Sequence, residues 1–329
     1  MADFIRSCNG GIRGLYDSIV MNDFDRLFSL SGLSLDRMRS FLMVAEAGNL
    51  AKAAKGDVTK QSQYSRQIKE LEGFFGVALT RRVGRRIEIT PEGKRLSTII
   101  LHQFRELDDF RKSSSGRGVS IRLGSQGSVI DWLVVPRLAE IRKLLGAALV
   151  ELEHMRSADV VRAVADGCLD FGIVREDAVP AKIKRWKLGS VGYSLFAAKA
   201  LVKGCPSVEK ALQECPVAEL LPGGQFAERF HQWLVSKRLN PEFFARVSSF
   251  TDLARIVQSG HAAAMLPELA AVDLDPKRFK RWPVTAIPPR KMALIANPRS
   301  LDRSGITPGI AAKLAALLGI ADAEANMTK

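Results

Sequence analysis

A helix-turn-helix pattern over residues 49–68 constrains the fold of this chain more than any other feature of its sequence. The first helix ends on the small residues Ala53 and Ala54, which allow a second helix to cross it closely. The second helix begins polar and becomes amphipathic, because its apolar residues recur at helical spacings. These apolar residues are Tyr64, Ile68, Leu71 and Phe75. The order predicts a module that places its second helix in the major groove of DNA.

The polar face of the second helix carries side chains that suit nucleic acid. Glutamine can pair bidentately with adenine and arginine with guanine, while serine is short enough to reach a phosphate or a base edge. We also predict that Thr59 caps this helix. The predicted DNA-binding residues of the helix are Thr59, Lys60, Gln61, Ser62, Ser65, Arg66 and Lys69. The alternative is an ordinary amphipathic helix pair whose polar face is only solvated.

The residues that follow this helix predict a β-hairpin wing. Two short extended runs flank a turn at Gly84. Four arginines surround this turn, namely Arg81, Arg82, Arg85 and Arg86. Such crowded like charges favour a polyanion nearby, through phosphate contact or insertion of an arginine into a minor groove. A solvated basic turn is the alternative. Residues 90–93 then predict a new helix, with Thr90 as its N-cap and proline in its first turn.

From Leu35 to about Leu96 the chain resembles the winged helix-turn-helix of LysR-type transcriptional regulators. The residues that carry the resemblance are Phe41, 44–46, Gly48, Ala53, Ala54, Gln61, 65–68, Leu71, Glu72, Gly76, Leu79, Arg82 and 90–93. The resemblance implies DNA contacts by Gln61, Ser62, Ser65, Arg66 and, in the wing, Arg85. The chain departs from the family pattern at Asp57, Lys60, Ser62 and Tyr64. These departures predict a rearranged turn at residues 56–57 and an unusual operator preference.

Composition and charge agree with a nucleic-acid partner. The chain has 329 residues, a formal net charge of +14 and a pI near 9.9, which suit a polyanionic ligand such as double-stranded promoter DNA. Further basic residues in the C-terminal half are interpreted as a solvated surface. No apolar run reaches the length of a membrane span, and the N-terminus lacks a secretory signal, so we expect a cytoplasmic protein without a membrane partner. Residues 1–32 are a flexible extension, a docking helix, or the product of an upstream start, with the natural start at Met21.

A long linker helix over residues 91–112 is predicted after the winged helix-turn-helix domain, which spans 33–90. Its apolar stripe is too wide for an exposed monomeric helix. The stripe contains Leu96, Ile99, Ile100, Phe104 and Leu107. The family resemblance implies that this linker helix pairs with its twin, giving a homodimer or homotetramer that works with RNA polymerase. A serine- and glycine-rich stretch over residues 113–118 predicts a hinge.

Beyond the hinge the pattern changes to α/β. Strands are predicted at 119–124, 149–153 and 169–174, with helices from Trp132 to Leu145 and over 157–166, which indicates a parallel sheet. The chain here resembles the two-lobed, periplasmic-binding-protein-like effector domain of the same family, over residues 119–300. We expect the first lobe at 119–187 and 262–300, the second at 188–261, and a C-terminal helix and tail at 301–329. The fold class is therefore α/β, behind a mainly α winged helix-turn-helix and linker helix.

The effector pocket is expected between the two lobes. Ligands of open α/β folds lie at the carboxyl ends of the strands, and hydroxyls with helix-start amides favour a carboxylate. The predicted effector-binding residues are Ser125, Gln126, Ser128, His154, Arg156, Gly223, Gly224, Gln225, Ser249 and Thr251. Alternatives are helix capping by Ser125 and Ser128, a partly buried structural His154, and an ion pair of Arg156 with Glu153. We expect a small-molecule effector, with a carboxylate as one option.

Cysteines and catalytic motifs give no sign of an enzyme. Cys8, Cys168, Cys205 and Cys215 show no metal-ligand spacing, and no nucleotide-binding or nucleophile motif is present. We therefore expect no cofactor, no metal and no catalytic residue. The ten-residue separation of Cys205 and Cys215 resembles that in peroxide-sensing members of the family, although inert thiols are the simpler interpretation. The alternative functions are a redox-sensing regulator, or an α/β enzyme or solute-binding protein with a nucleic-acid-binding appendage.

Overall fold

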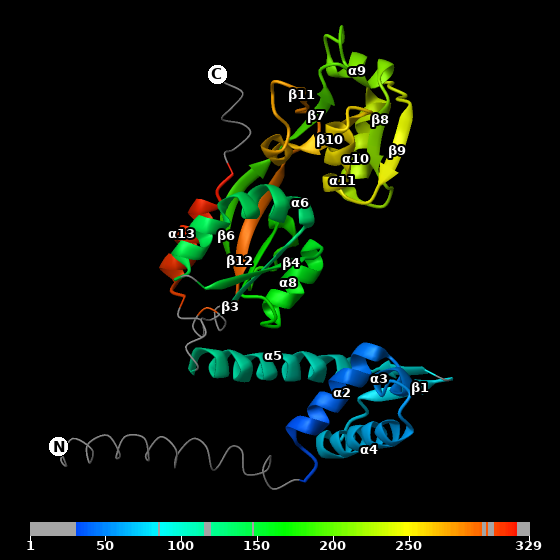
Figure 1. Cartoon of the computed structure of the whole chain (residues 1–329), viewed down its shortest axis with the longest axis vertical. Helices are drawn as coiled ribbons and strands as arrows, with labels where there is room; N and C mark the ends of the chain where they lie inside the picture. The colour runs from blue at the N-terminus through cyan, green and yellow to red at the C-terminus, as the bar shows by residue number, and fades with distance from the viewer. Residues whose placement is uncertain are drawn as a thin grey trace, which may run out of the picture. The chain divides into compact units, whose positions relative to one another are not determined.

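The computed structural model describes residues 31–84, 86–114, 120–146, 148–297, 301 and 306–320, without the side chains of 109 and 112–114. The chain divides into two compact units, Met1–Leu107 and Asp108–Lys329 (Figure 1). Outside the described residues lie Arg85, Cys8 and nearly all of the predicted extension 1–32. The same holds for residues 115–118 of the predicted hinge and for 302–305 and 321–329 of the predicted C-terminal helix and tail. Each unit is described by itself below.

The first unit contains the predicted helix-turn-helix and its wing. Its elements are α2 (Leu35–Ala47), α3 (Leu50–Ala53), α4 (Val58–Phe75), β1 (Thr80–Val83), β2 (Arg86–Ile89) and the start of α5 (Pro91–Ser114). The core is formed by apolar residues from every helix, among them Phe41, Ala53, Leu71 and Ile100, all buried. The buried apolar stripe of α4 is shorter than predicted: Ile68 and Leu71 are buried, whereas Phe75 at the end of the helix is exposed.

The start of α4 corrects one prediction. Asp57, and not Thr59, is the N-cap: its Oδ1 accepts a hydrogen bond from the backbone N of Lys60 at 3.1 Å. Asp57 has the extended backbone of a cap residue, with φ −73° and ψ 112°, whereas Thr59 is already the second residue of the helix. Aspartate is among the strongest capping residues. The residue that departs from the family pattern here therefore starts the predicted recognition helix.

The wing is a two-stranded β-hairpin, and each of its ends is fixed to a helix. Strands β1 and β2 pair antiparallel, with Thr80 opposite Ile89 and Val83 opposite Arg86. Glu72 of α4 accepts hydrogen bonds from the backbone N atoms of Leu79 (2.9 Å) and Thr80 (3.0 Å), which ties the start of the wing to α4.

At its other end the wing is pressed against the first turn of α5. Thr90 accepts from the backbone N of Gly93 at 3.0 Å, as the predicted cap does, and its hydroxyl donates to the carbonyl of Ala78 at 2.7 Å. A Cβ on Gly93 would lie 2.2 Å from the Leu79 carbonyl oxygen. Glycine is therefore required for this close approach.

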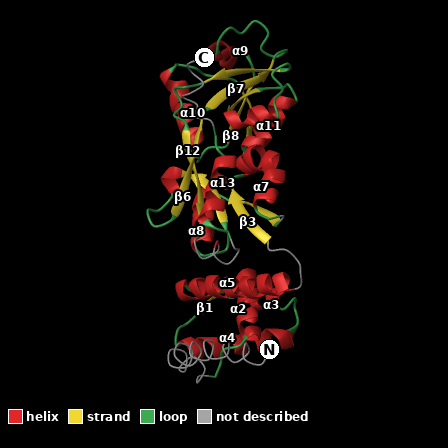
Figure 2. Ribbon diagram, turned by 90° about the vertical axis from the view of Figure 1, so that its left-hand side faces the viewer, coloured by secondary structure: helices red, strands yellow, loops and turns green. Residues whose placement is uncertain are grey.

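The second unit contains two five-stranded sheets, each with helices on both faces (Figure 2). The first lobe has the strand order β4-β3-β5-β12-β6. Its strands are β3 (Ser120–Ser125), β4 (Leu149–His154), β5 (Phe171–Arg175), β6 (Lys184–Val191) and β12 (Arg290–Ala296). The strands β3, β4 and β5 are parallel, and β12 runs antiparallel to its neighbours β5 and β6. The helices α7 (Leu138–Leu144) and α13 (Pro308–Leu317) cover one face, and α8 (Ser157–Ala165) covers the other.

The second lobe has the strand order β11-β7-β10-β8-β9. Its strands are β7 (Tyr193–Ala198), β8 (Val217–Leu220), β9 (Phe243–Val247), β10 (Ala263–Pro267) and β11 (Phe279–Pro283). Its helices are α9 (Val208–Glu214), α10 (Gln225–Ser236) and α11 (Phe250–Gln258), with a short 3-10 turn at Glu268–Val272. Separate apolar clusters on the two faces pack α9 and α10 on one side and α11 on the other.

The lobe boundaries differ from the expected ones. We expected residues 262–300 to return to the first lobe, but β10 and β11 both pair with β7 in the second sheet. All five residues of β10 are buried, so this strand needs neighbours on both sides, and the second sheet provides them. The strand β6, expected partly in the second lobe, completes the first sheet. The chain therefore crosses between lobes at Gly192 and again over residues 284–289.

The helix expected from Trp132 to Leu145 is a composite. A short α-helical turn α6 (Gly127–Val129) is followed by a π-helical turn at Ile130–Val134, a 3-10 turn that contains Pro136, and then α7. The π turn places the Trp132 side chain in the core of the second lobe, where its Nε1 donates to Asp273 Oδ2 at 2.8 Å. A residue of the first lobe's chain thereby joins the two lobes.

The capping assignment gives a direct prediction for α4. Asp57→Ala should speed hydrogen exchange of the first-turn amides of α4 by about fivefold, since a lost cap costs about 1 kcal/mol. Thr59→Ala, two residues away on the same turn, is the matched control and should change exchange little. Hydrogen exchange of the full-length protein followed by mass spectrometry measures both. A larger effect of Thr59→Ala would contradict the assignment.

Candidate functional site

The polar face of α4 is open to solvent. Ser62, Arg66 and Lys69 are exposed at spacings of four and three residues, which places them on one face of the helix. Thr59 and Lys60 are also exposed in the first turn, whereas Gln61 and Ser65 are half-buried. Arg66 Nε lies 3.6 Å from Oε1 of Glu70, a half-buried carboxylate that is also paired with Arg37. The Arg66 side chain itself is exposed, so this pair contributes little to stability and leaves the guanidinium able to move to another partner.

The charge of the wing is smaller than the sequence predicts. Arg81 is paired with Glu88 across the hairpin, with its NH2 at 2.6 Å and its Nε at 2.9 Å from Glu88 Oε2. Arg82 and Arg86 are exposed, and Arg85 lies outside the described residues. One of the four arginines therefore has an acidic partner within the wing, which reduces the repulsion that favoured a polyanion there.

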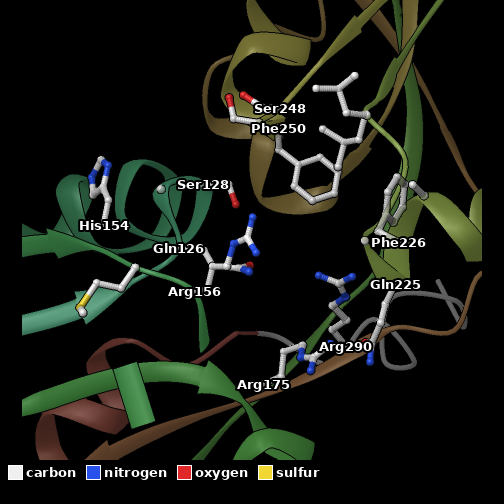
Figure 3. A pocket seen from close by; sticks show the side chains of 17 residues that line it. Gln126, Ser128, His154, Arg156, Arg175, Gln225, Phe226, Ser248, Phe250 and Arg290 are labelled. Atoms are coloured by element: carbon white, nitrogen blue, oxygen red, sulfur yellow. Dashed lines mark hydrogen bonds between the residues drawn. The ribbon is translucent and has the colours of Figure 1, made fainter. Parts of the chain in front are cut away.

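A cleft of about 430 Å³ lies between the lobes of the second unit (Figure 3). From the first lobe it is lined by residues at the ends of β3, β4 and β5 and the start of β12. From the second lobe it is lined by residues that follow β8 and β9 and begin α10 and α11. The carboxyl ends of the parallel strands of both sheets thus meet at the cleft, the position where open α/β folds bind ligands.

Three guanidinium groups give the cleft its charge. Arg156 follows β4, Arg175 ends β5 and Arg290 begins β12, and Figure 3 shows all three side chains directed into the cleft. None of the described residues that line the cleft is an aspartate or glutamate. Burial, with repulsion from Arg175 among its further causes, lowers the pKa of Arg290. A cleft with this excess of positive charge favours an anionic ligand.

The second lobe contributes an aromatic wall opposite these arginines. The rings of Phe226 and Phe250 meet edge to face, with centroids 4.9 Å apart. The ring of Tyr193, on β7, lies 4.6 Å from that of Phe226. Burial raises the pKa of Tyr193 to about 12, so its phenol stays neutral at physiological pH. The wall can therefore pack against an apolar or planar part of a ligand but offers it no charge.

The start of α10 adds polar groups to the same wall. Gly224 is the N-cap of α10 and has no side chain to satisfy the amides of the first turn, which lack partners within any helix. Such amides attract anions. Gln225, the first residue of α10, accepts a hydrogen bond from Arg175 of the first lobe, so this pair connects the two lobes at the cleft.

The structure brings most of the predicted effector-binding residues to the cleft. Those that line it are Gln126, Ser128, His154, Arg156, Gly224, Gln225 and Ser249. His154 is exposed and lies away from the three arginines in Figure 3, rather than partly buried as the alternative proposed. Ser128 does not cap a helix, because the N-cap of α6 is Gln126.

Three predicted residues, Ser125, Gly223 and Thr251, do not line the cleft. Ser125 is fully buried and its hydroxyl donates to the carbonyl of Ile173 at 2.7 Å, so it links β3 to β5. The hydroxyl of Thr251 lies 2.9 Å from that of Ser249. Ser249 in turn caps α11 by accepting from the backbone N of Asp252 at 3.1 Å. These hydroxyls therefore serve the local structure.

Arg175, Arg290 and the aromatic wall line the cleft but were not among the residues predicted to bind the effector. Arg175 follows the predicted third strand directly, so the rule that ligands lie at strand ends identifies it. Arg290 begins β12, a strand that was not predicted from the sequence. It reaches the cleft because β12 runs antiparallel to β5. Phe226 and Phe250 are adjacent to predicted cleft residues, but nothing in the sequence indicates which side their rings face.

The cysteine pair lies in the core of the second lobe. Cys205 and Cys215 are both buried thiols. Cys205 Sγ lies 3.8 Å from Glu214 Oε2, and Cys215 Sγ donates to the Leu201 carbonyl at 3.5 Å. Burial, together with the neighbouring Cys205 thiol and Glu214 carboxylate, raises the pKa of Cys215 to about 11. Such an environment disfavours the reactive thiolate.

Two features of the described residues concern metal binding and membrane crossing. Within the described residues, no group of three or more histidine, cysteine, aspartate and glutamate side chains is arranged to hold a metal ion. Of the described helices, none combines the length and the apolar character that crossing a membrane requires.

Comparisons with known proteins match both units of the chain. A family model for the LysR substrate binding domain matches residues 114–306. A second, for bacterial regulatory helix-turn-helix proteins of the lysR family, matches residues 35–94.

Individual relatives have low sequence identity to this chain. The uncharacterized HTH-type transcriptional regulator YhjC of Escherichia coli (strain K12) is 30% identical over 44% of this chain, but the match spans only half of YhjC. The nitrogen assimilation regulatory protein nac of Klebsiella aerogenes is 25% identical over 74% of this chain and 81% of its own length. The crystal structure of full-length CbnR complexed with its target DNA has a TM-score of 0.57, with 20% identity over 83% of this chain and 98% of that one. This likeness concerns the fold.

The buried thiols give a prediction for the redox alternative. With a pKa of about 11, only about one Cys215 in ten thousand is a thiolate at pH 7, against a few per cent for an ordinary cysteine. Treatment of the native protein with hydrogen peroxide should therefore leave both thiols titratable after unfolding and DNA affinity unchanged. Cys205→Ser/Cys215→Ser is the control and should behave like the unmodified protein. A disulfide between the two, with altered DNA binding, would support the redox alternative instead.

Proposed function

The chain belongs to the LysR family of DNA-binding transcriptional regulators, and on that premise we propose that it responds to a small organic anion bound between its C-terminal lobes. It is a regulator with an effector-binding domain and not an enzyme. The observation that carries the proposal is the cleft lined by Arg156, Arg175 and Arg290 with no carboxylate among its described lining residues.

The chemistry of the cleft favours a carboxylate with an apolar body. A carboxylate can be held bidentately by a guanidinium and can also accept from Ser128 and from the first amides of α10. The remaining part of the ligand would pack on Phe226 and Phe250, whose rings offer apolar surface on the opposite side. Asp177 offsets the charge of Arg175, but a neutral ligand would leave Arg156 and Arg290 without a carboxylate among the described residues that line the cleft, which is unfavourable.

For DNA, we propose that α4 reads the bases and that the wing contacts the backbone. The exposed Ser62, Arg66 and Lys69 suit base edges and phosphates in a major groove. Arg82, Arg86 and the sequence-predicted Arg85 suit phosphates or a minor groove beside it. Thr59, Lys60, Gln61 and Ser65 complete the proposed surface, with Arg81 weakened by its pairing to Glu88.

The active form is proposed to be a homo-oligomer that pairs through α5. One side of α5 packs on the winged helix-turn-helix through Leu96 and Ile100, but Ile99 and Leu107 are 51% and 54% exposed. Apolar side chains this exposed along one helix support a partner helix that covers them. A dimer would also present two recognition helices to a two-fold operator. We place its action in the cytoplasm, with RNA polymerase as a further partner at the promoter.

The DNA surface is tested by one pair of variants. Arg66→Ala should weaken binding to the footprinted operator by about 1–3 kcal/mol and relax its base preference, if Arg66 reads a base. Arg86→Ala should weaken operator and scrambled DNA alike and reduce the salt dependence of binding, since a phosphate contact carries no sequence information. Fluorescence anisotropy with both DNAs at several salt concentrations measures this. Equal and small effects of the two changes would reject the proposed contacts.

The effector class is tested by calorimetry on the full-length protein. Titration with a panel of aliphatic and aromatic carboxylic acids should identify a binder. Arg156→Gln should weaken that binder by about 1.5–3 kcal/mol, because it removes a charged hydrogen bond. Arg162→Gln on α8 is the control and should leave affinity unchanged, since Arg162 is exposed outside the cleft. Heat from neutral compounds alone, with none from acids, would reject the carboxylate.

A further inference from the structure

A second cavity of about 390 Å³ adjoins the effector cleft. The two cavities share Arg175, Gln225 and Arg290, which therefore stand between them. Arg229 and Lys291 line only the second cavity, whereas Arg156 and Ser128 line only the cleft. The second cavity thus adds Arg229 and Lys291 to the two arginines that it shares with the cleft, so its charged lining differs from that of the cleft.

The charges around the second cavity do not balance. Its cationic side chains are Arg175, Arg229, Arg290 and Lys291, and its carboxylates are Glu176 and Asp177. Asp177 is engaged by Arg175, with its Oδ1 3.2 Å from the arginine Nε. Two positive charges therefore remain in excess among the described lining residues.

Arg175, Arg229 and Arg290 line the same cavity. Repulsion from Arg175 and Arg229 adds to burial in lowering the pKa of Arg290. The same three arginines oppose the rise that burial causes in the pKa of Tyr193, over whose ring Arg290 lies with its Cζ 5.8 Å from the ring centroid. Because this phenol stays protonated, it supplies no balancing negative charge. An anion between the arginines would relieve their repulsion.

The arginines also converge from three separate elements. Arg175 ends β5, Arg290 begins β12, and Arg229 lies one turn beyond Gln225 on α10, on the same face of that helix. Guanidiniums that approach from several directions suit a tetrahedral oxyanion, because each planar fork can engage a different pair of its oxygens.

We propose that this second cavity binds a doubly charged oxyanion, phosphate or the phosphate group of a phosphomonoester, between Arg175, Arg229 and Arg290. Lys291 adds charge at the rim of the same cavity. The site does not depend on the carboxylate proposed for the cleft and would persist if the cleft bound another class of compound. It gives the regulator a second chemical signal beside its effector.

The test uses full-length protein and two probes, inorganic phosphate and glycerol 3-phosphate, titrated calorimetrically at an ionic strength held constant with potassium chloride. Arg229→Gln should weaken binding of the preferred probe by at least about tenfold, because one charged hydrogen-bonding partner is lost. Arg229→Lys should restore part of the affinity. Arg156→Gln should bind the probe as the unmodified protein does, since Arg156 lines only the cleft.

The outcomes separate the two sites. Binding of phosphate alone identifies the free ion as ligand, and preference for glycerol 3-phosphate identifies a phosphorylated metabolite; both support the site. Unchanged affinity in a folded Arg229→Gln protein, equal loss in Arg156→Gln, or no heat from either probe overturns it. Failure of every organic acid, with probe binding intact in Arg156→Gln, rejects the carboxylate effector and leaves this site standing. Identical circular dichroism and cooperative thermal unfolding of the variants exclude misfolding.

Discussion

The positive charge of Arg156, Arg175 and Arg290, which line one cleft, is the constraint from which the binding properties of the C-terminal unit follow. The strand ends of the first lobe bring these charges together, and the described lining of the second lobe answers with aromatic rings, amides and Gln225 rather than with a carboxylate. The lobes are joined by the indole of Trp132 in the second lobe's core, by its hydrogen bond to Asp273, and by the hydrogen bond from Arg175 to Gln225. An anion in the cleft would add the attraction that the protein itself omits.

The winged helix-turn-helix could be predicted closely because its signals are local. The spacing of Ile68 and Leu71 defines the buried face of α4, Gly84 marks the hairpin turn, and Thr90 caps the next helix, all within a few residues of their effects. The N-cap of α4 was predicted wrongly because two residues with good capping side chains, Asp57 and Thr59, lie two positions apart. Only the backbone conformation decides between Asp57 and Thr59, and the sequence pattern allows either.

The two lobes were harder to predict because their order is set by long-range pairing. The sequence of residues 260–267 is compatible with a return to the first lobe and also with an inner strand of the second lobe. The pairing of β10 with β7 and β8 shows that it is an inner strand of the second lobe. The cleft shows the same limit. Residues that follow a parallel strand, such as Arg156, could be named, whereas Arg290 reaches the cleft from a strand of opposite direction. A rule about strand ends does not find it.

The carboxylate of Glu72 has a consequence for the DNA as well as for the protein. By holding the first residues of the wing against the end of α4, it makes helix and hairpin a single rigid body, and Gly93 closes that body from the other side. A rigid reader with two contact points cannot adjust their spacing to each sequence. If α4 and the wing both contact DNA as proposed, we expect the duplex to supply the adjustment through its groove width and its flexible steps, so that operators are selected partly by how easily they deform, at positions that no side chain touches.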